Sequence, residues 1–239
     1  MAHSTSSNEV KDITITPCKV ATAIASVSLL LIVLSTIGQI GKYFFGVHLP
    51  GTTLFFLDNE FNIPSIFSQL ILLTSGLILT YIFFLEKKHA NAKYWLVLAC
   101  GFYFMSLDEV ISIHERLNPI ASSLIHDAGG VFTFAWVLPY IIIVVFFAFF
   151  FLRFLLSLPK TSRINFIIAG SLYLLGAIGL EMIGGDYYGA HGTKDTLVYA
   201  AFVTIEESCE MFGISFFIYS LLQYIQQAHR NLILSVRVV

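Results

Sequence analysis

The sequence predicts an all-α membrane protein, a polytopic bundle of about six transmembrane helices with both termini in the cytoplasm. Two observations indicate this class. Hydrophobic residues make up 57% of the 239 residues and charged residues only 12%, whereas a soluble domain carries about 25% charged residues. Apolar stretches long enough to cross a hydrocarbon core, about 20 residues as a helix, recur along the whole chain. A soluble fold is therefore not expected, and little chain remains for a separate soluble domain.

Apolar runs between polar breaks predict spans at residues 20–45, 63–85, 94–112, 131–156, 164–183 and 196–224. We interpret the first run as a retained helix rather than a signal peptide, because no small-residue cleavage pattern clearly follows it. The spans form a single transmembrane domain over residues 20–224, between a polar N-terminal tail (1–19) and a short basic C-terminal tail (225–239).

Basic residues predict the orientation of this bundle. The short breaks at 86–93 and 159–163 and the C-terminal tail contain lysine and arginine, and all three fall on one side of a six-span topology. The positive-inside rule makes this side the cytoplasm. The longer segments 46–62, 116–130 and 184–195 then face outward. We expect an integral protein of a bacterial plasma membrane with this orientation.

Seven carboxylates fall in or beside the otherwise apolar spans: Asp108, Glu109, Glu115, Glu181, Glu206, Glu207 and Glu210. An ionised carboxylate near the bilayer centre costs about 2.5 to 3.5 kcal/mol even on the lenient insertion scales, so a group of them needs a compensating arrangement. Helical spacing places Asp108, Ser112 and Glu115 on one face, and Glu206 and Glu210 on another that Gly213 extends. The predicted depths agree, so the third, fifth and sixth spans are expected to share one site in the outer half of the bundle.

Bound metal is one way to offset this charge, since carboxylates and imidazoles from several helices build non-haem di-iron and di-manganese centres. Carboxylate ligation favours iron or manganese over zinc, although the usual Glu-x-x-His signature is absent. The predicted metal ligands are Asp108, His114, Glu115, Glu181, Glu206 and Glu210, and the predicted catalytic acids or bases are Glu109 and Glu207.

Several residues near this cluster are not assigned to the site by helical spacing. In an ideal helix His114 lies more than about 90° from the Asp108 stripe, so either it faces another neighbour or the helix unwinds there. Arg116 is the one obvious cation beside the carboxylates. Asp186 and His191 lie in a glycine-rich turn that is a candidate lid, and His126 lies in another outward segment. Whether the histidines of these segments reach the site stays open.

Three functions are compatible with the cluster. The first is a membrane-embedded, metal-dependent enzyme, a hydrolase or oxidoreductase that acts on a lipid or other hydrophobic substrate. The second is a proton- or cation-coupled transporter or channel that uses the same carboxylates as its ion path. The third is an accessory membrane subunit. Shared protons or a water-filled cavity are alternatives to metal as the source of charge compensation.

Other classes of chemistry are not indicated. The three cysteines, Cys18, Cys100 and Cys209, form no CxxC pair, so neither a disulfide framework nor a thiolate zinc site is expected. No nucleotide-binding motif is found, no nucleic-acid partner is expected, and the sequence indicates no particular oligomeric state.

Two motifs carry a resemblance to a known group. They are Ser-Leu-Asp-Glu-x-x-x-x-His-Glu, which begins at Ser106, and Glu-Glu-x-x-Glu-Met-x-Gly, which begins at Glu206. Together they resemble an uncharacterised group of bacterial multi-pass membrane proteins over most of the chain, from the third span onward. The resemblance implies a six-helix membrane fold and brings no known activity.

Overall fold

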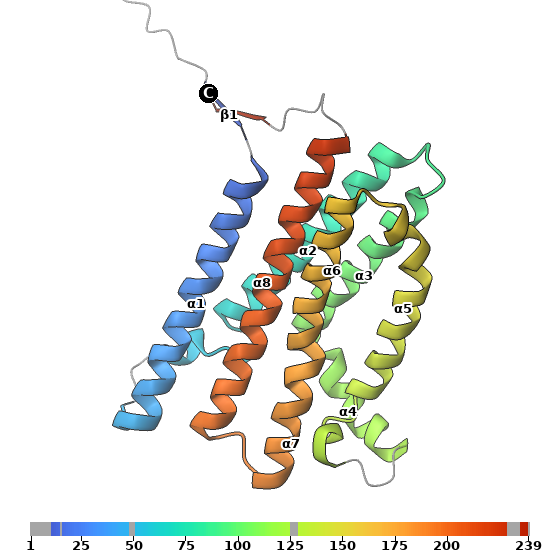
Figure 1. Ribbon diagram of the computed structural model, residues 1–239. Coiled ribbons are helices and arrows are strands. Elements are labelled where there is room, and N and C mark those ends of the chain that lie inside the picture. Colours follow the sequence, from blue (N-terminus) through green and yellow to red (C-terminus); the bar gives the residue numbers. More distant parts are fainter. Residues whose placement is uncertain (1–10, 15, 48–50, 125–128, 229–234, 239) are drawn as a thin grey trace, which may run out of the picture.

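The computed structural model describes residues 11–14, 16–47, 51–124, 129–228 and 235–238 and consists almost entirely of helices that run side by side (Figure 1). The long helices are α1 (Pro17–Phe45), α2 (Ile63–Glu86), α3 (Ala92–Ile111), α5 (Val137–Ser157) and α8 (Leu197–Ala228). A further continuous helical segment consists of α6 (Lys160–Leu174), the π-helix η3 (Leu175–Leu180) and α7 (Glu181–His191).

Shorter elements connect these helices. They are η1 (Thr52–Phe55) between α1 and α2, and α4 (Ile113–Leu124) and η2 (Gly130–Phe132) between α3 and α5. The two tails meet in a short antiparallel pair of strands, β1 (Lys11–Thr14) and β2 (Ser235–Val238). Both tails thus lie at the same end of the bundle (Figure 1).

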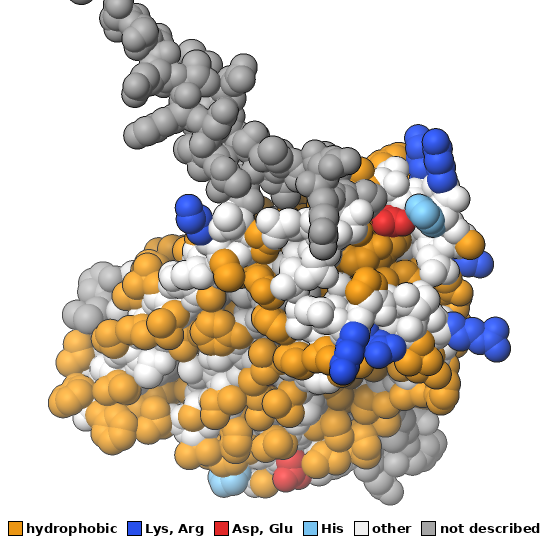
Figure 2. Space-filling model, turned by 45° about the horizontal axis from the view of Figure 1, so that its top comes forward, with side chains coloured by type: hydrophobic (Ala, Val, Ile, Leu, Met, Phe, Trp, Pro, Cys, Tyr) orange, Lys and Arg blue, Asp and Glu red, His pale blue; other side chains and the backbone are white. Residues whose placement is uncertain are grey.

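The helices have the length and apolarity of membrane spans, which confirms the predicted helical membrane bundle. Within the described residues, five segments meet these criteria: Pro17–Phe45, Ile63–Glu86, Ala92–Ile111, Val137–Ser157 and Lys160–His191. The 32-residue helix α8 is the sixth long segment and packs against α1, α2 and α6. Figure 2 shows a broad hydrophobic surface, with Lys and Arg side chains around the end turned toward the viewer.

The outer face of α5 illustrates how this surface is built. Ile142, Phe146 and Phe149 are 65 to 74% exposed, although they are among the most apolar side chains in the protein. In water such a surface would drive aggregation, whereas in a bilayer it contacts hydrocarbon chains at no cost.

The fifth span is longer than the sequence predicts. Residues 184–191 were expected to form a flexible outward turn, but they continue the helix to His191. The prediction was wrong because glycines are usual in turns, whereas here they make room for a neighbour. A Cβ atom at Gly185 would lie 2.9 Å from the ring of Phe134, and one at Gly189 would lie 2.5 Å from Thr133 Oγ1. The glycines of α7 therefore allow the segment around η2 to pack directly on the helix backbone.

Close backbone contact also joins η3 and α6 to α8. A Cβ atom at Gly176 would lie 2.7 Å from the carbonyl oxygen of Glu206 and 2.8 Å from Cγ of Glu210. One at Gly213 would lie 2.8 Å from the backbone nitrogen of Tyr173. Small residues at such positions let membrane helices approach and gain van der Waals contact. The two glycines hold the acidic stretch of α8 against η3.

This packing makes a testable prediction about Gly176. Gly176→Ala should lower the free energy of unfolding by about 1 to 3 kcal/mol, because the added methyl group overlaps the α8 backbone. The matched control is Gly170→Ala, since a Cβ atom at Gly170 has no heavy atom within 4 Å. The control should be neutral or slightly stabilising. Reversible unfolding in mixed micelles measures both values, and equal effects of the two substitutions would contradict the close contact.

Candidate functional site

One cavity of about 250 Å³ collects the acidic residues of the bundle. It lies between α3, α4, α5, the η3–α7 segment and α8, near the end of the bundle that carries the α1–α2 and α7–α8 loops. All eight residues predicted as metal ligands or catalytic groups line it: Asp108, Glu109, His114, Glu115, Glu181, Glu206, Glu207 and Glu210. The structure therefore brings together side chains that are up to 102 positions apart in the sequence, from Asp108 to Glu210.

A break between α3 and α4 places His114 in the cavity. The chain leaves the helix at Ser112, which adopts a left-handed conformation with φ 48°, and α4 begins at Ile113. A serine in this region of backbone space is strained, and its hydroxyl donates a hydrogen bond to Glu60 on the α1–α2 loop. Of the two alternatives left open by the sequence, unwinding of the helix is the one observed.

The break lets Asp108 and His114 face each other. Asp108 Oδ1 accepts a hydrogen bond from the backbone N–H of His114 at 3.0 Å, and Oδ2 lies 3.2 Å from His114 Nδ1. The Tyr140 hydroxyl donates to the same Oδ2 at 3.2 Å. Both oxygens of Asp108 are thus engaged, and the carboxylate fixes the orientation of the imidazole, as carboxylates do for ligand histidines in metal sites.

The surroundings of His114 favour its charged form. Burial lowers the pKa of the imidazole, but the hydrogen bond and charge of Asp108 outweigh burial, with smaller contributions from Glu181 and Glu115, so that the pKa lies above its usual value of 6.5. The ring packs against Trp136 with 4.7 Å between ring centroids, and Trp136 packs against Tyr140 at 5.0 Å. This side of the cavity therefore has a polar pair held in an aromatic wall.

The opposite side of the cavity is formed by carboxyl groups of α8 and α7. The side chains of Glu206 and Glu181 come within hydrogen-bonding reach of each other. In the described part of the chain, Glu109, Glu207 and Glu210 form neither an ion pair nor a hydrogen bond with another side chain. Carboxyl groups in such a place require protons, a cation or water.

Sequence reasoning missed part of the lining. Asp58 and Glu60 come from the α1–α2 loop, Tyr173 and Tyr199 from α6 and α8, and Lys194 from the α7–α8 loop. Loop residues have no helical period that could place them. The nearby cation was expected to be Arg116, but Arg116 is exposed and is not part of the lining, whereas Lys194 is.

The candidate lid residues do not line the cavity. His191 stacks on Tyr187 with ring centroids 4.0 Å apart, and its Nδ1 lies 2.9 Å from the Tyr187 carbonyl oxygen. Asp186 is exposed on the same helix, where its Oδ1 would be 3.5 Å from a Cβ atom at Gly130. Both residues are parts of α7 and not of a flexible turn. His126 lies outside the described residues.

The carboxyl groups are distributed around the cavity wall. Among the described residues, no group of three or more His, Cys, Asp or Glu side chains is arranged to hold a metal ion. A metal ion bound here would therefore require changes of side-chain rotamer. As it stands, the arrangement can bind cations, exchange protons and exclude anions.

Fold and site together define an integral membrane protein with an acidic cavity between its helices. The chain belongs to the family described as a domain of unknown function (DUF8692), whose match covers residues 22–224 and so includes every helix that lines the cavity. This confirms that the chain is a member of an uncharacterised group. None of the curated proteins and none of the solved structures matches the chain.

The Asp108–His114 pair predicts a pH-dependent part of the stability. Because the folded-state pKa of His114 is raised above 6.5, the pair stabilises the fold fully below about pH 6.5, and this stabilisation is lost as the pH rises through the folded-state pKa. Asp108→Asn keeps an oxygen for the backbone N–H of His114 but removes the charge. Thermal midpoints measured at about pH 5.5 and about pH 9 should differ between wild type and variant more at the lower pH. A difference independent of pH would contradict the ion pair.

Proposed function

We propose that this protein is a membrane-embedded, metal-dependent enzyme that acts on a lipid or other hydrophobic substrate in the acidic cavity. The observation that supports the proposal is the convergence of eight predicted carboxylate and histidine residues on one cavity. A bound divalent or redox metal ion, iron or manganese before zinc, would offset the carboxylate charge and supply Lewis-acid or redox chemistry.

The residues of the cavity have different roles in this proposal. Glu181, Glu206, Glu210 and Nε2 of His114 are the proposed metal ligands, with Glu115 at the mouth as a further candidate. A metal ion at Nε2 would take the place of the proton that this nitrogen carries in the charged imidazole. Asp108 was predicted as a ligand, but its hydrogen bonds to His114 and Tyr140 favour a positioning role. Glu109 and Glu207 remain the proposed acid and base, since a group that exchanges protons must not be tied to a permanent partner.

The cavity ends at an apolar core, which favours an enzyme over a transporter. One turn beyond Glu210, α8 continues with Ile214, Ile218, Leu221 and Ile225, all at most 3% exposed. Phe102 stacks on Phe217 beside them with ring centroids 4.8 Å apart. A through path for ions would need a continuous series of polar groups or water at this depth. The buried polar side chains on this part of α8, Ser215 and Ser220, instead donate hydrogen bonds to carbonyl oxygens of their own helix.

In the proposed orientation the cavity opens to the outside of a bacterial plasma membrane. The turn between α2 and α3 contains the exposed Lys87 and Lys88, and α6 begins with the exposed Lys160. These lysines lie at the end opposite the cavity mouth. The positive-inside rule places that end in the cytoplasm. Single cysteines introduced in the α2–α3 turn, treated with a membrane-impermeant thiol reagent, test this orientation. They should stay unlabelled in intact cells, and labelling there would show that the turn faces outward.

The proposal predicts the metal content of the purified protein. Elemental analysis of protein prepared without chelator and without nickel affinity resin should find stoichiometric metal in the wild type. Glu206→Gln and Glu210→Gln should lose the metal. Asp108→Asn should still bind it, but with an affinity lower by about tenfold or more, as expected when a residue that orients a ligand is changed.

Glu86→Gln is the matched control. Glu86 lies at the end of α2 away from the cavity, where it accepts a hydrogen bond from Tyr224, and glutamine keeps an oxygen for this bond. The control should therefore bind metal as the wild type does. If the wild type holds no metal even after reconstitution, the proposal is wrong, and proton or cation flux in liposomes becomes the measurement to make.

A further inference from the structure

Three aromatic rings surround the ammonium group of Lys194 at the mouth of the cavity. Nζ of Lys194 lies 5.0 Å from the ring centroid of Phe134, 5.7 Å from that of Tyr199 and 5.9 Å from that of Tyr188. All three distances lie within the range in which a cation is attracted to the face of an aromatic ring. Phe134 and Tyr188 stack on each other with centroids 5.8 Å apart. We call these three rings the aromatic cage.

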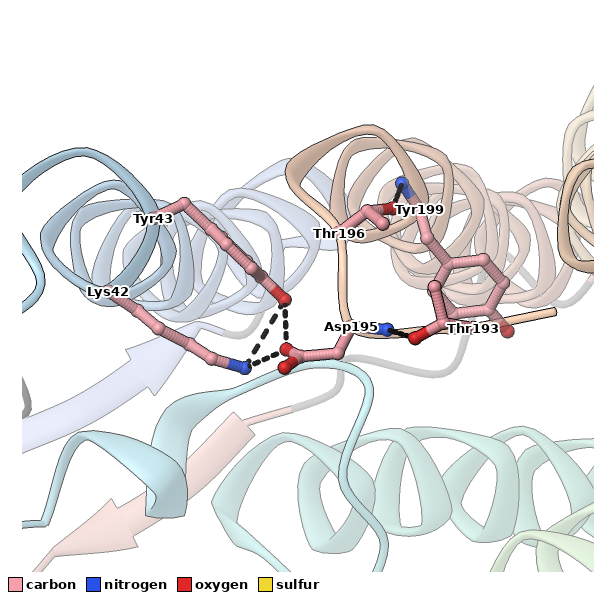
Figure 3. Close-up of polar contacts among 6 residues, drawn as sticks. All are labelled: Lys42, Tyr43, Thr193, Asp195, Thr196 and Tyr199. Atoms are coloured by element: carbon pink, nitrogen blue, oxygen red, sulfur yellow. Dashed lines mark hydrogen bonds and ion pairs between the residues drawn. The ribbon is translucent and has the colours of Figure 1, made fainter. Parts of the chain in front are cut away.

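The loop that carries Lys194 is held by its next residue. Asp195 Oδ1 lies 2.5 Å from Lys42 Nζ and accepts a hydrogen bond of 2.8 Å from the Tyr43 hydroxyl, and both partners belong to α1 (Figure 3). Thr196 then caps α8 by accepting a hydrogen bond from the backbone N–H of Tyr199. The backbone is thus fixed on both sides of the cage, while the Lys194 side chain is exposed and free to leave.

Lys194 and the Tyr199 ring also line the acidic cavity, whereas Phe134 and Tyr188 lie outside its lining. Nine carboxyl groups line the cavity, against one lysine and one histidine: Asp58, Glu60, Asp108, Glu109, Glu115, Glu181, Glu206, Glu207 and Glu210. Wherever these groups are ionised, they attract a cation and repel a phosphate group. This disfavours phosphocholine lipids and favours a ligand whose only charge is positive.

The wall between α5 and η3 is apolar. Val144 of α5 and Leu174, Ala177 and Ile178 of the helix that faces it all line the cavity, and Met105 of α3 continues this surface. Such a wall suits a hydrocarbon chain, because the burial of each methylene group is favourable and needs no polar partner. The cavity thus combines a site for an organic cation with a surface for its chain.

From these observations we infer that the aromatic cage binds the alkylated ammonium group of a cationic amphiphile, in the place that the Lys194 side chain takes in its absence. The chain of the amphiphile lies along the apolar wall between α5 and η3. Both cations make the same contacts with the rings, but an alkylammonium is more weakly hydrated than the lysine ammonium and so loses less hydration when it enters the cage. The alkylammonium therefore displaces the lysine side chain. This inference rests on the proposed function, for which it names the class of substrate.

Isothermal titration of the full-length protein, in nanodiscs of uncharged lipid, tests this inference with three probes. Hexyltrimethylammonium should bind, tetramethylammonium should bind more weakly because it lacks the chain, and the uncharged N,N-dimethylhexylamine N-oxide should bind least. Binding of the N-oxide as tight as that of the cation would overturn the role of charge. Equal affinity for both cations would overturn the amphiphile.

Two kinds of variant separate the cage from a general attraction of cations. Lys194→Met frees the cage and should tighten binding of hexyltrimethylammonium by about two- to fivefold, the size expected for a cation–π contact at an exposed site. Tyr188→Leu should weaken it by a similar factor. His191→Leu, which removes an aromatic group of α7 outside the cage, is the control and should bind as the wild type does. An unchanged affinity in Lys194→Met would overturn the inference. Because Lys194 is exposed, the substitution should leave the fold intact, and a thermal midpoint equal to that of the wild type excludes misfolding as the cause.

The test distinguishes this inference from the proposed function. Each titration is run on protein whose metal content has been counted, before and after removal of metal by a chelator. Binding of the alkylammonium by a wild type that holds no metal even after reconstitution leaves the inference standing and contradicts the metalloenzyme. Stoichiometric metal without binding of the alkylammonium contradicts the substrate class and leaves the metalloenzyme standing.

Discussion

The rest of the structure depends on one constraint, the cost of placing carboxyl groups inside a bundle that lipid surrounds. Each such group needs a proton, a cation, water or a hydrogen-bond donor within reach. The bundle meets this need by gathering them at one cavity instead of distributing them along separate helices. Asp108 obtains His114 and Tyr140 as partners, whereas the carboxyl groups of α8 share a space that is open to exchange with solvent or ligand.

Local irregularities make this gathering possible. The left-handed Ser112 ends α3 early enough for His114 to turn back onto Asp108. The π-helix η3 widens one turn beside the Glu206–Glu210 stretch, and Gly176 removes the side chain that would keep α8 away. π-turns and strained backbone are found often at functional sites, because a fold keeps them only where the surroundings compensate their cost. Here both lie next to the acidic groups and not in the apolar half of the bundle.

Much of this organisation could be predicted from the sequence. Hydropathy places the long helices because the hydrocarbon core sets both their length and their polarity, and helical spacing with depth was sufficient to bring Asp108, Glu181 and Glu206 to one site. The sequence left the helix break near His114 as one of two alternatives, and the helical state of residues 184–191 was not predicted, because in both places a tertiary contact overrides the local preference. Lys194 was missed for another reason: its position depends on how Asp195 binds to α1, which no local pattern encodes.

The π-helix has a consequence for how this chain tolerates changes of length. A π-turn accommodates one residue more than an α-turn along the same helical path, so the segment 175–180 holds a residue that the helix on either side does not need. Deleting one position there would leave α6 and α7 with the same faces toward α8, and Glu181 would still point into the cavity. Only the widened turn would close. A deletion elsewhere in the same helix would rotate everything after it by about 100°, so a relative shorter by one residue in this segment would keep the acidic site.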